Sequence, residues 1–233
     1  MPDPFTPFVP GSLAETLLTD PLAPLPPRPA GELADRTRVL VEAAYGLLHE
    51  EGLEGLTIRA VLKRTGLARR AFYERFAGKD DLVLAVFEHA LHGAAGHFRR
   101  LAEGFVDPFD KLHLIVSSIV LGAIGAEGGE TPSDRRGAAL SREHLRLAES
   151  RPAELQVALA PLLGLIAEIV AQGIAEGRFR ACDPALQATF LYNLVSTTVH
   201  TELLAEESGL RAGEERQRLE REIWEFCRRA IAA

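Results

Sequence analysis

Positively charged side chains are concentrated in one short stretch of the sequence. Residues 57–79 contain seven basic residues and a single acid, Glu74, and so carry a net +6, whereas the rest of the −7 chain carries −13. Guanidinium groups bind phosphate oxygens, and a bidentate pair also matches O6 and N7 of guanine. The pattern indicates a protein that meets nucleic acid through one small surface, although a solvated basic helix face has the same composition. The basic residues are Arg59, Lys63, Arg64, Arg69, Arg70, Arg75 and Lys79.

Two short helices joined by a tight turn would position these side chains. Thr57 can cap the first of them through its hydroxyl. In the turn Gly66-Leu67, the glycine can take a positive φ and the leucine can fill the angle between the helices. A second short helix over about 68–75 would turn Phe72 inward. The sequence therefore predicts a helix-turn-helix at about residues 57–76.

Helical periodicity continues on both sides of this unit. Before it, Leu40, Ala44, Leu47 and Leu48 form one apolar stripe of a helix that begins near residue 32 and ends at Gly52. No stretch alternates with period two, so the sequence predicts an all-α protein. The further helices are expected at about 79–103, 108–126, 134–149, 152–177, 183–207 and 213–231.

Residues from about 37 to 88 closely resemble the DNA-binding domain of the tetracycline-repressor (TetR) family. This resemblance implies a three-helix helix-turn-helix domain at 32–78, joined to a larger helical ligand-binding and dimerisation domain at 79–233. It rests on Leu40, Val41, Ala44, Leu48, Glu51-Gly52, Leu56-Thr57-Ile58-Arg59, Gly66-Leu67, Phe72-Tyr73, Phe76 and Lys79-Asp80-x-Leu82.

The proposed DNA contacts follow from the helix order and from the resemblance. In a helix-turn-helix the early residues of the second helix reach base edges, which makes Arg69 and Arg70 the candidate base readers. Lys79 opens the next helix, where free N–H groups already favour an anion. The resemblance implies contacts to the DNA backbone or an outer base by Thr57 and Arg59. It also implies phosphate contacts by Tyr73, Arg75 and Lys79.

Two departures from the family pattern concern the DNA-reading helix. Ala68 stands where the family often has serine, so a hydroxyl cap is missing. The Arg69-Arg70 pair replaces small or uncharged polar residues, so an operator sequence cannot be transferred from relatives. Taken without the resemblance, the same residues also fit two packed helices with a basic rim.

The predicted helices 152–177 and 183–207 are long and largely apolar. By resemblance, such a pair forms a four-helix dimer interface with its mate, while periodicity alone fits an intramolecular core equally well. The candidate interface residues are Leu162, Leu165, Ile166, Ile169, Val170, Phe190, Leu191, Leu194, Val195 and Val199.

The sequence signal for a small-molecule site is weak. Pockets are mostly apolar with a few placed polar groups. His89 and His92 have the i, i+3 spacing of a metal pair, but solvent-facing or hydrogen-bonded histidines are the default, so neither a metal nor a cofactor is expected. No catalytic arrangement is evident, and an enzyme is not expected. The candidate ligand-binding residues are His89, His92, His113, Tyr192, Asn193 and His200.

The remaining features concern the N-terminal segment and the compartment. Residues 1–31 hold nine of the fourteen prolines and predict an extended arm, with a turn over Ser12–Leu18 that could dock on the body. We expect no secretory signal, since the N-terminus lacks a basic segment followed by an apolar one. We also expect no membrane span, since no apolar run approaches about 20 residues. The cysteines, Cys182 and Cys227, suggest neither a disulfide framework nor a zinc site and suit a reducing cytoplasm.

Three hypotheses follow. The first is a cytoplasmic homodimeric repressor that a small-molecule ligand releases from a palindromic DNA operator. The second is a DNA-binding regulator controlled by a protein partner through the proline-rich arm. The third is an all-helical ligand carrier or enzyme whose basic hairpin is incidental.

Overall fold

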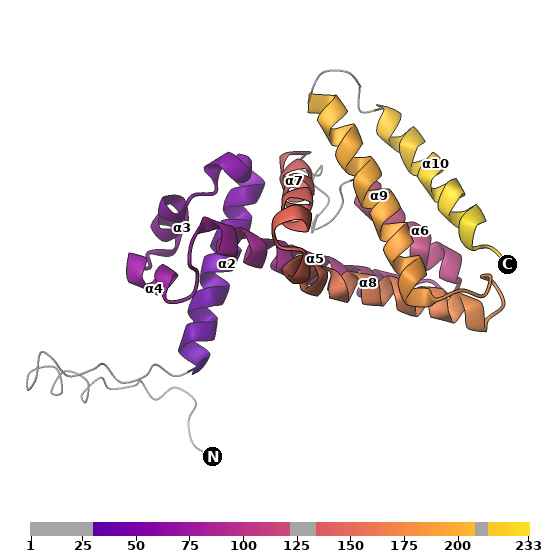
Figure 1. Ribbon diagram of the computed structural model, residues 1–233, viewed down its shortest axis with the longest axis horizontal. Helices are drawn as coiled ribbons and strands as arrows, with labels where there is room; N and C mark the ends of the chain where they lie inside the picture. Colours follow the sequence, from indigo (N-terminus) through magenta and orange to yellow (C-terminus); the bar gives the residue numbers. More distant parts are fainter. Residues whose placement is uncertain (1–29, 122–133, 208–213) are drawn as a thin grey trace, which may run out of the picture. The chain divides into compact units, whose positions relative to one another are not determined.

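The computed structural model describes residues 30–121, 134–207 and 214–233, and over these residues the chain forms nine α-helices (Figure 1). The prediction of an all-α protein is confirmed. Outside the helices, the described residues contribute an isolated antiparallel bridge between Phe179 and Ala232. The helices are α2 (Ala30–Gly55), α3 (Ile58–Thr65), α4 (Arg69–Tyr73), α5 (Lys79–Ala102), α6 (Pro108–Val120), α7 (Asp134–Ser150), α8 (Pro152–Ala175), α9 (Pro184–Glu207) and α10 (Glu214–Ile231).

Most helix ends agree with the sequence prediction. Gly52 interrupts α2 with a φ of 70°, a left-handed conformation that glycine adopts at little cost. The helix expected at 108–126 instead ends at Val120, and residues 122–126 lie outside the described residues. Residues 1–29 of the predicted arm, including its Ser12–Leu18 turn, also lie outside the described residues. The last two residues of the arm, 30 and 31, belong to α2.

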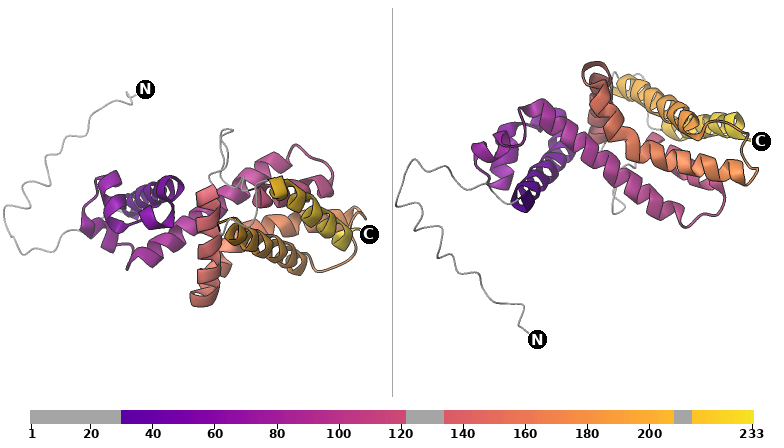
Figure 2. Two further views of the ribbon diagram at one scale, coloured as in Figure 1. Left: turned by 90° about the horizontal axis from the view of Figure 1, so that it is seen from above. Right: turned by 60° about the horizontal axis from the view of Figure 1, so that its bottom comes forward.

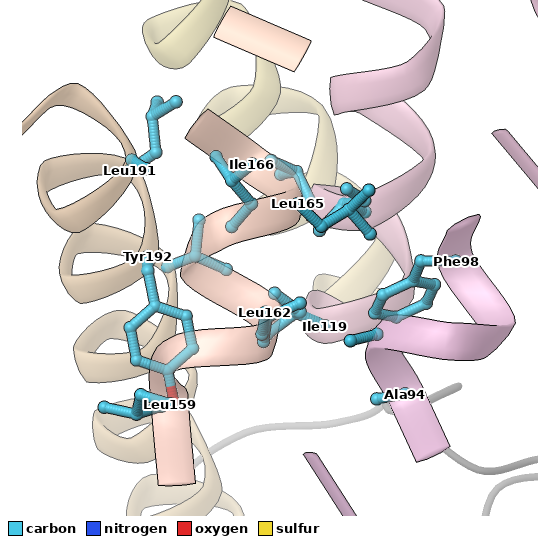
Figure 3. Packing of buried hydrophobic residues seen from close by; sticks show 14 of the residues in the cluster. Ala94, Phe98, Ile119, Leu159, Leu162, Leu165, Ile166, Leu191 and Tyr192 are labelled. Carbon is cyan, nitrogen blue, oxygen red and sulfur yellow. The ribbon is translucent and has the colours of Figure 1, made fainter. Parts of the chain in front are cut away.

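The buried apolar residues form two separate clusters, and α5 contributes to both. The smaller cluster holds α2, α3 and α4 together and includes Leu82, Val83 and Val86 of α5. The larger cluster includes Phe87 and Phe98 of the same helix and gathers side chains from α5 to α10. Figure 3 shows part of it, with labelled side chains from α5, α6, α8 and α9. The long helix α5 is therefore a continuous element that runs from one core into the other (Figure 2).

Helix α8 is the central element of the larger cluster. It packs against α5, α6, α7 and α9, and its apolar side chains Leu162, Leu165 and Ile166 are at most 3% exposed. By length and composition alone α8 could cross a membrane, contrary to the expectation that no apolar run approaches a span. Its position within the helical core explains this composition, because a helix covered on several sides needs apolar residues on each of them.

Candidate nucleic-acid interface

The turn between α3 and α4 has the geometry that the sequence predicts. The Thr57 hydroxyl accepts a hydrogen bond from the Ala60 N–H at 3.1 Å and so caps α3. Gly66 follows the helix with a φ of 68°, and its N–H donates to the Leu62 carbonyl at 3.0 Å. Leu67 packs against the smaller core cluster, as expected for a residue that fills the angle between two helices.

Helix α4 is anchored by one face and exposes the other. Phe72 is fully buried and Ala71 nearly so, whereas Arg69, Arg70 and Tyr73 are exposed. Phe72 meets the Tyr73 and Phe76 rings at centroid distances of 5.2 and 5.3 Å. At the helix start Ala68 makes no side-chain cap, as expected from the missing hydroxyl. A single buried aromatic thus fixes the direction in which the basic face points.

The arginines of α4 make weak contacts within their own helix. The Arg69 guanidinium donates to the Tyr73 hydroxyl at 3.2 Å and lies 5.4 Å from the centre of its ring. Arg70 pairs with Glu74 at 3.0 Å, with 73% of the arginine side chain exposed. Exposed i, i+4 pairs are worth about 0.3–0.5 kcal/mol, so DNA can replace these partners at little cost.

The other predicted contact residues differ in their surroundings. Arg59 is exposed on α3. Arg75 lies beyond the end of α4 rather than on it, because the helix ends at Tyr73, and its guanidinium lies 5.9 Å from the centre of the Phe76 ring. Lys79 opens α5 as predicted, but it is half-buried and its ammonium donates to the Leu53 carbonyl at 3.2 Å. This bond satisfies a carbonyl just after the Gly52 break.

The candidate ligand-binding residues do not form one site. His89 is exposed and meets the Tyr45 ring edge-on at 5.4 Å. His92 is exposed with its Nδ1 3.1 Å from the Glu88 carbonyl, and Asn193 is exposed on α9. His113 stacks on Trp224 at 4.6 Å, with its Nε2 2.9 Å from Glu220.

Tyr192 and His200 belong instead to a polar group that His144 of α7 completes. The Tyr192 hydroxyl lies 3.3 Å from His144 Nδ1, and the imidazole also faces the Phe87 ring. Burial lowers the pKa of His144, and the charge of His200 lowers it further. Burial likewise raises the pKa of Tyr192. Sequence reasoning missed His144 because it stands among charged residues on a helix with few apolar ones.

The lowered pKa of His144 predicts a loss of stability in mild acid. An unfolded histidine titrates near 6.5, so below that pH the unfolded chain binds a proton that the folded chain resists. The free energy of unfolding should therefore decrease as the pH falls below about 6.5, with a slope of at most about 1.4 kcal/mol per pH unit from this group. Urea titrations from pH 5 to 7 should show a flatter dependence for His144→Gln. The same change at the exposed His92 should leave the slope as in the wild type; equal slopes for all three proteins would contradict the assignment.

The predicted dimer interface stays a prediction, and its candidate residues differ in exposure within the described chain. The interface candidates on α8 are buried within one chain, where they contact other helices of the same chain. On α9, Leu191 and Val195 are also buried, whereas Phe190 and Leu194 are 57% and 36% exposed. Phe226 of α10, which sequence reasoning missed, is 63% exposed and lines a groove of about 280 Å³ with Phe190 and Leu194. It lies between Glu222 and Arg229 on one face of a charged helix, and this was the available signal.

Comparison with known proteins agrees with this geometry. No curated protein matches the chain. A TetR-family transcriptional regulator from Pectobacterium atrosepticum is 16% identical with a TM-score of 0.69, over 88% of this chain and 98% of that one. RolR in complex with resorcinol is 16% identical with a TM-score of 0.63, over 85% and 90% of the two chains. FadR from Bacillus subtilis in complex with stearoyl-CoA is 17% identical with a TM-score of 0.59, over 82% and 96%.

The N-terminal unit gives the family assignment. Residues 40–86 match the family described as "Bacterial regulatory proteins, tetR family". The match covers the C-terminal part of α2, all of α3 and α4, and the first two turns of α5. The N-terminal helices thus match the tetR-family model, and the described helices share the fold of the solved TetR-family structure from Pectobacterium atrosepticum.

Proposed function

We propose that the protein is a cytoplasmic, homodimeric repressor that leaves a palindromic operator when a small molecule binds its larger helical core. The observation that carries the proposal is the exposed pair Arg69 and Arg70 at the start of α4, held outward by the buried Phe72. In a helix-turn-helix this is the position that reads base edges in the major groove. The mechanism requires binding and movement, and no catalytic step.

A second copy of the chain is proposed to pack on the α9–α10 surface, which we define by Phe190, Leu194 and Phe226. Large exposed aromatic and aliphatic residues from two neighbouring helices favour a helix-on-helix interface over contact with water. Two-fold symmetry would then present two α4 helices to successive major grooves, about 34–36 Å apart. A palindromic operator follows from this symmetry.

An effector is proposed to act by opening the larger core. Among the described residues, a gap of about 10 Å³ lies beside Tyr192 between α6, α8 and α9, and it is lined mainly by aliphatic side chains. A volume of that size holds about one water molecule, so a larger ligand there must part the helices. Since α5 belongs to both cores, a shift of α5 in the larger core would move α4. The similar folds of RolR and FadR, solved with resorcinol and stearoyl-CoA, favour a small-molecule effector over a protein partner.

The test of this function starts from a random-sequence duplex pool, from which the purified protein selects its own binding sequence. We expect enrichment of an inverted repeat, and an affinity for the selected duplex that falls steeply with salt. Absence of any enriched sequence would favour the ligand carrier or enzyme. Mass spectrometry of small molecules released from the denatured protein distinguishes the effector hypothesis from control by a protein partner through the arm.

Separate roles for Arg70 and Lys79 predict different mutant behaviour on the selected duplex. Arg70→Ala should relax the preference at one base-pair position, at a cost of about 1–3 kcal/mol for the preferred sequence. Lys79→Ala should weaken all sequences alike and reduce the salt slope by about one unit. Fluorescence anisotropy with single-position duplex variants at several salt concentrations measures both. If neither variant alters sequence preference, the base-reading role of Arg70 is wrong.

A further inference from the structure

Two acidic residues at the start of α5 are tied to α7 and to the residue that joins α7 to α8. Asp80 Oδ1 lies 3.3 Å from Arg146 Nη1, and Asp81 Oδ1 accepts from Arg151 Nη1 at 2.7 Å. We call these four residues the clasp. Its members are about 65–70 positions apart in sequence, so they join the DNA-binding unit to elements of the larger core.

Asp81 also holds the turn that follows α4. Its second oxygen, Oδ2, accepts the backbone N–H of Ala77 at 2.9 Å, and the hydrogen bond from Ala77 and the Arg151 contact both lower the pKa of this carboxyl. Ala77 comes directly after Phe76, which is buried against Phe72 of α4. One carboxylate therefore connects Arg151 with the backbone that leaves the recognition helix.

The other side of the clasp is oriented by carboxylates of α7 and α8. Arg151 donates to Glu154 at 3.1 Å, and Arg146 pairs at 2.8 Å with Glu143, whose side chain is only 6% exposed. A buried carboxylate costs free energy unless it is paired, so Glu143 restricts where Arg146 can point. Glu143 is followed by His144, which contacts Tyr192 in the larger core.

We propose that Arg151 is a positioning residue for DNA reading: through Asp81 it holds the α4–α5 turn, and thereby fixes the recognition helix against the α7–α8 junction. This role rests on the proposed function, because it places a direct contact between the effector-binding core and the DNA-reading unit. A recognition helix that is held in place loses less conformational freedom when it enters the groove. Release of Arg151 therefore weakens sequence-specific binding, whereas non-specific attraction to phosphates is unchanged.

The first test measures hydrogen exchange in the full-length protein without DNA. Arg151→Gln and Asp81→Asn should each accelerate amide exchange in residues 74–78. The double variant should exchange no faster than Asp81→Asn alone, because Arg151 acts on this turn only through Asp81. Arg151→Lys should restore part of the protection. The matched control is Arg99→Gln, which breaks the bidentate 2.7 and 3.2 Å pair with Glu168 between α5 and α8. This control variant should leave the amide exchange rates of residues 74–78 as in the wild type.

The second test compares the selected duplex with a scrambled duplex by anisotropy. Arg151→Gln should lower the ratio of the two affinities about fivefold, the low end of site-to-site couplings, while Arg99→Gln should not change it. Wild-type exchange and an unchanged ratio in Arg151→Gln would overturn the positioning role, as would an equal effect of Arg99→Gln. If the wild-type protein selects no specific duplex, sequence-specific DNA binding itself is refuted, whatever the exchange data show.

Discussion

A protein with Phe226 replaced by glutamate should be monomeric and should bind the selected duplex about 100-fold more weakly than the wild type. The charge would stand in the centre of the proposed α9–α10 surface, where burial of an unpaired carboxylate is strongly unfavourable. The monomer would read one half-site, and the loss of the second, linked contact costs about 10²–10⁴ in affinity. Sedimentation velocity measures the first effect and anisotropy the second.

The control for this change is Val157→Glu, which places the same charge on α8, where Val157 is 68% exposed. That variant should stay dimeric and bind DNA as the wild type does. If Val157→Glu dissociates the dimer and Phe226→Glu does not, the interface lies on α8 and the assignment to α9 and α10 is wrong. Circular dichroism establishes that both variants are folded.

Replacement of Phe72 by alanine should lower the free energy of unfolding by about 3–5 kcal/mol, the usual cost of removing a buried phenylalanine. Phe72 is 0% exposed and anchors α4 to the smaller core, where it packs with Phe76 and with aliphatic side chains. Domains are stable by only about 5–15 kcal/mol, so the DNA-binding unit should lose its structure at or near physiological temperature. Urea denaturation followed by circular dichroism measures the change.

The neighbouring residue gives the matched control. Tyr73→Ala removes an aromatic side chain of similar size from the same helix, but Tyr73 is 45% exposed. Its unfolding free energy should change by less than about 1 kcal/mol, even though a proposed phosphate contact is lost. Equal destabilisation by the two changes would show that α4 is not anchored by Phe72 alone.

The sequence predicts the DNA-binding unit well because its structure depends on local features. Thr57 caps a helix that begins one residue later, and the left-handed Gly66 ends that helix directly after Thr65. The apolar spacing of the first helix is likewise visible over a few turns. The positions of Arg69 and Arg70 on the exposed side follow directly from the burial of Phe72.

The larger core depends on pairings that local patterns do not encode. Helix α8 has the apolar composition of an interface helix, but whether it faces a mate or its own chain is decided by the packing of four other helices around it. The clasp joins Asp81 to a residue 70 positions away, and each partner taken alone resembles an ordinary solvated charge. Lys79 shows the same limit, since its partner is a backbone carbonyl 26 residues earlier in the chain.

Because α5 contributes to two cores, inserting or deleting residues in it changes the relative orientation of its two apolar faces. Leu82, Val83 and Val86 face one core, while Leu84, Phe87 and Leu91 face the other. Each residue advances an α-helix by about 100°, so deletion of Ala85 would rotate Phe87 and Leu91 by about 100° relative to Leu82 and Val83 and turn one apolar face away from its core. A seven-residue insertion completes nearly two turns, retains both faces and lengthens the helix by about 10 Å. Natural variation in the length of α5 should therefore keep to steps of three, four or seven residues.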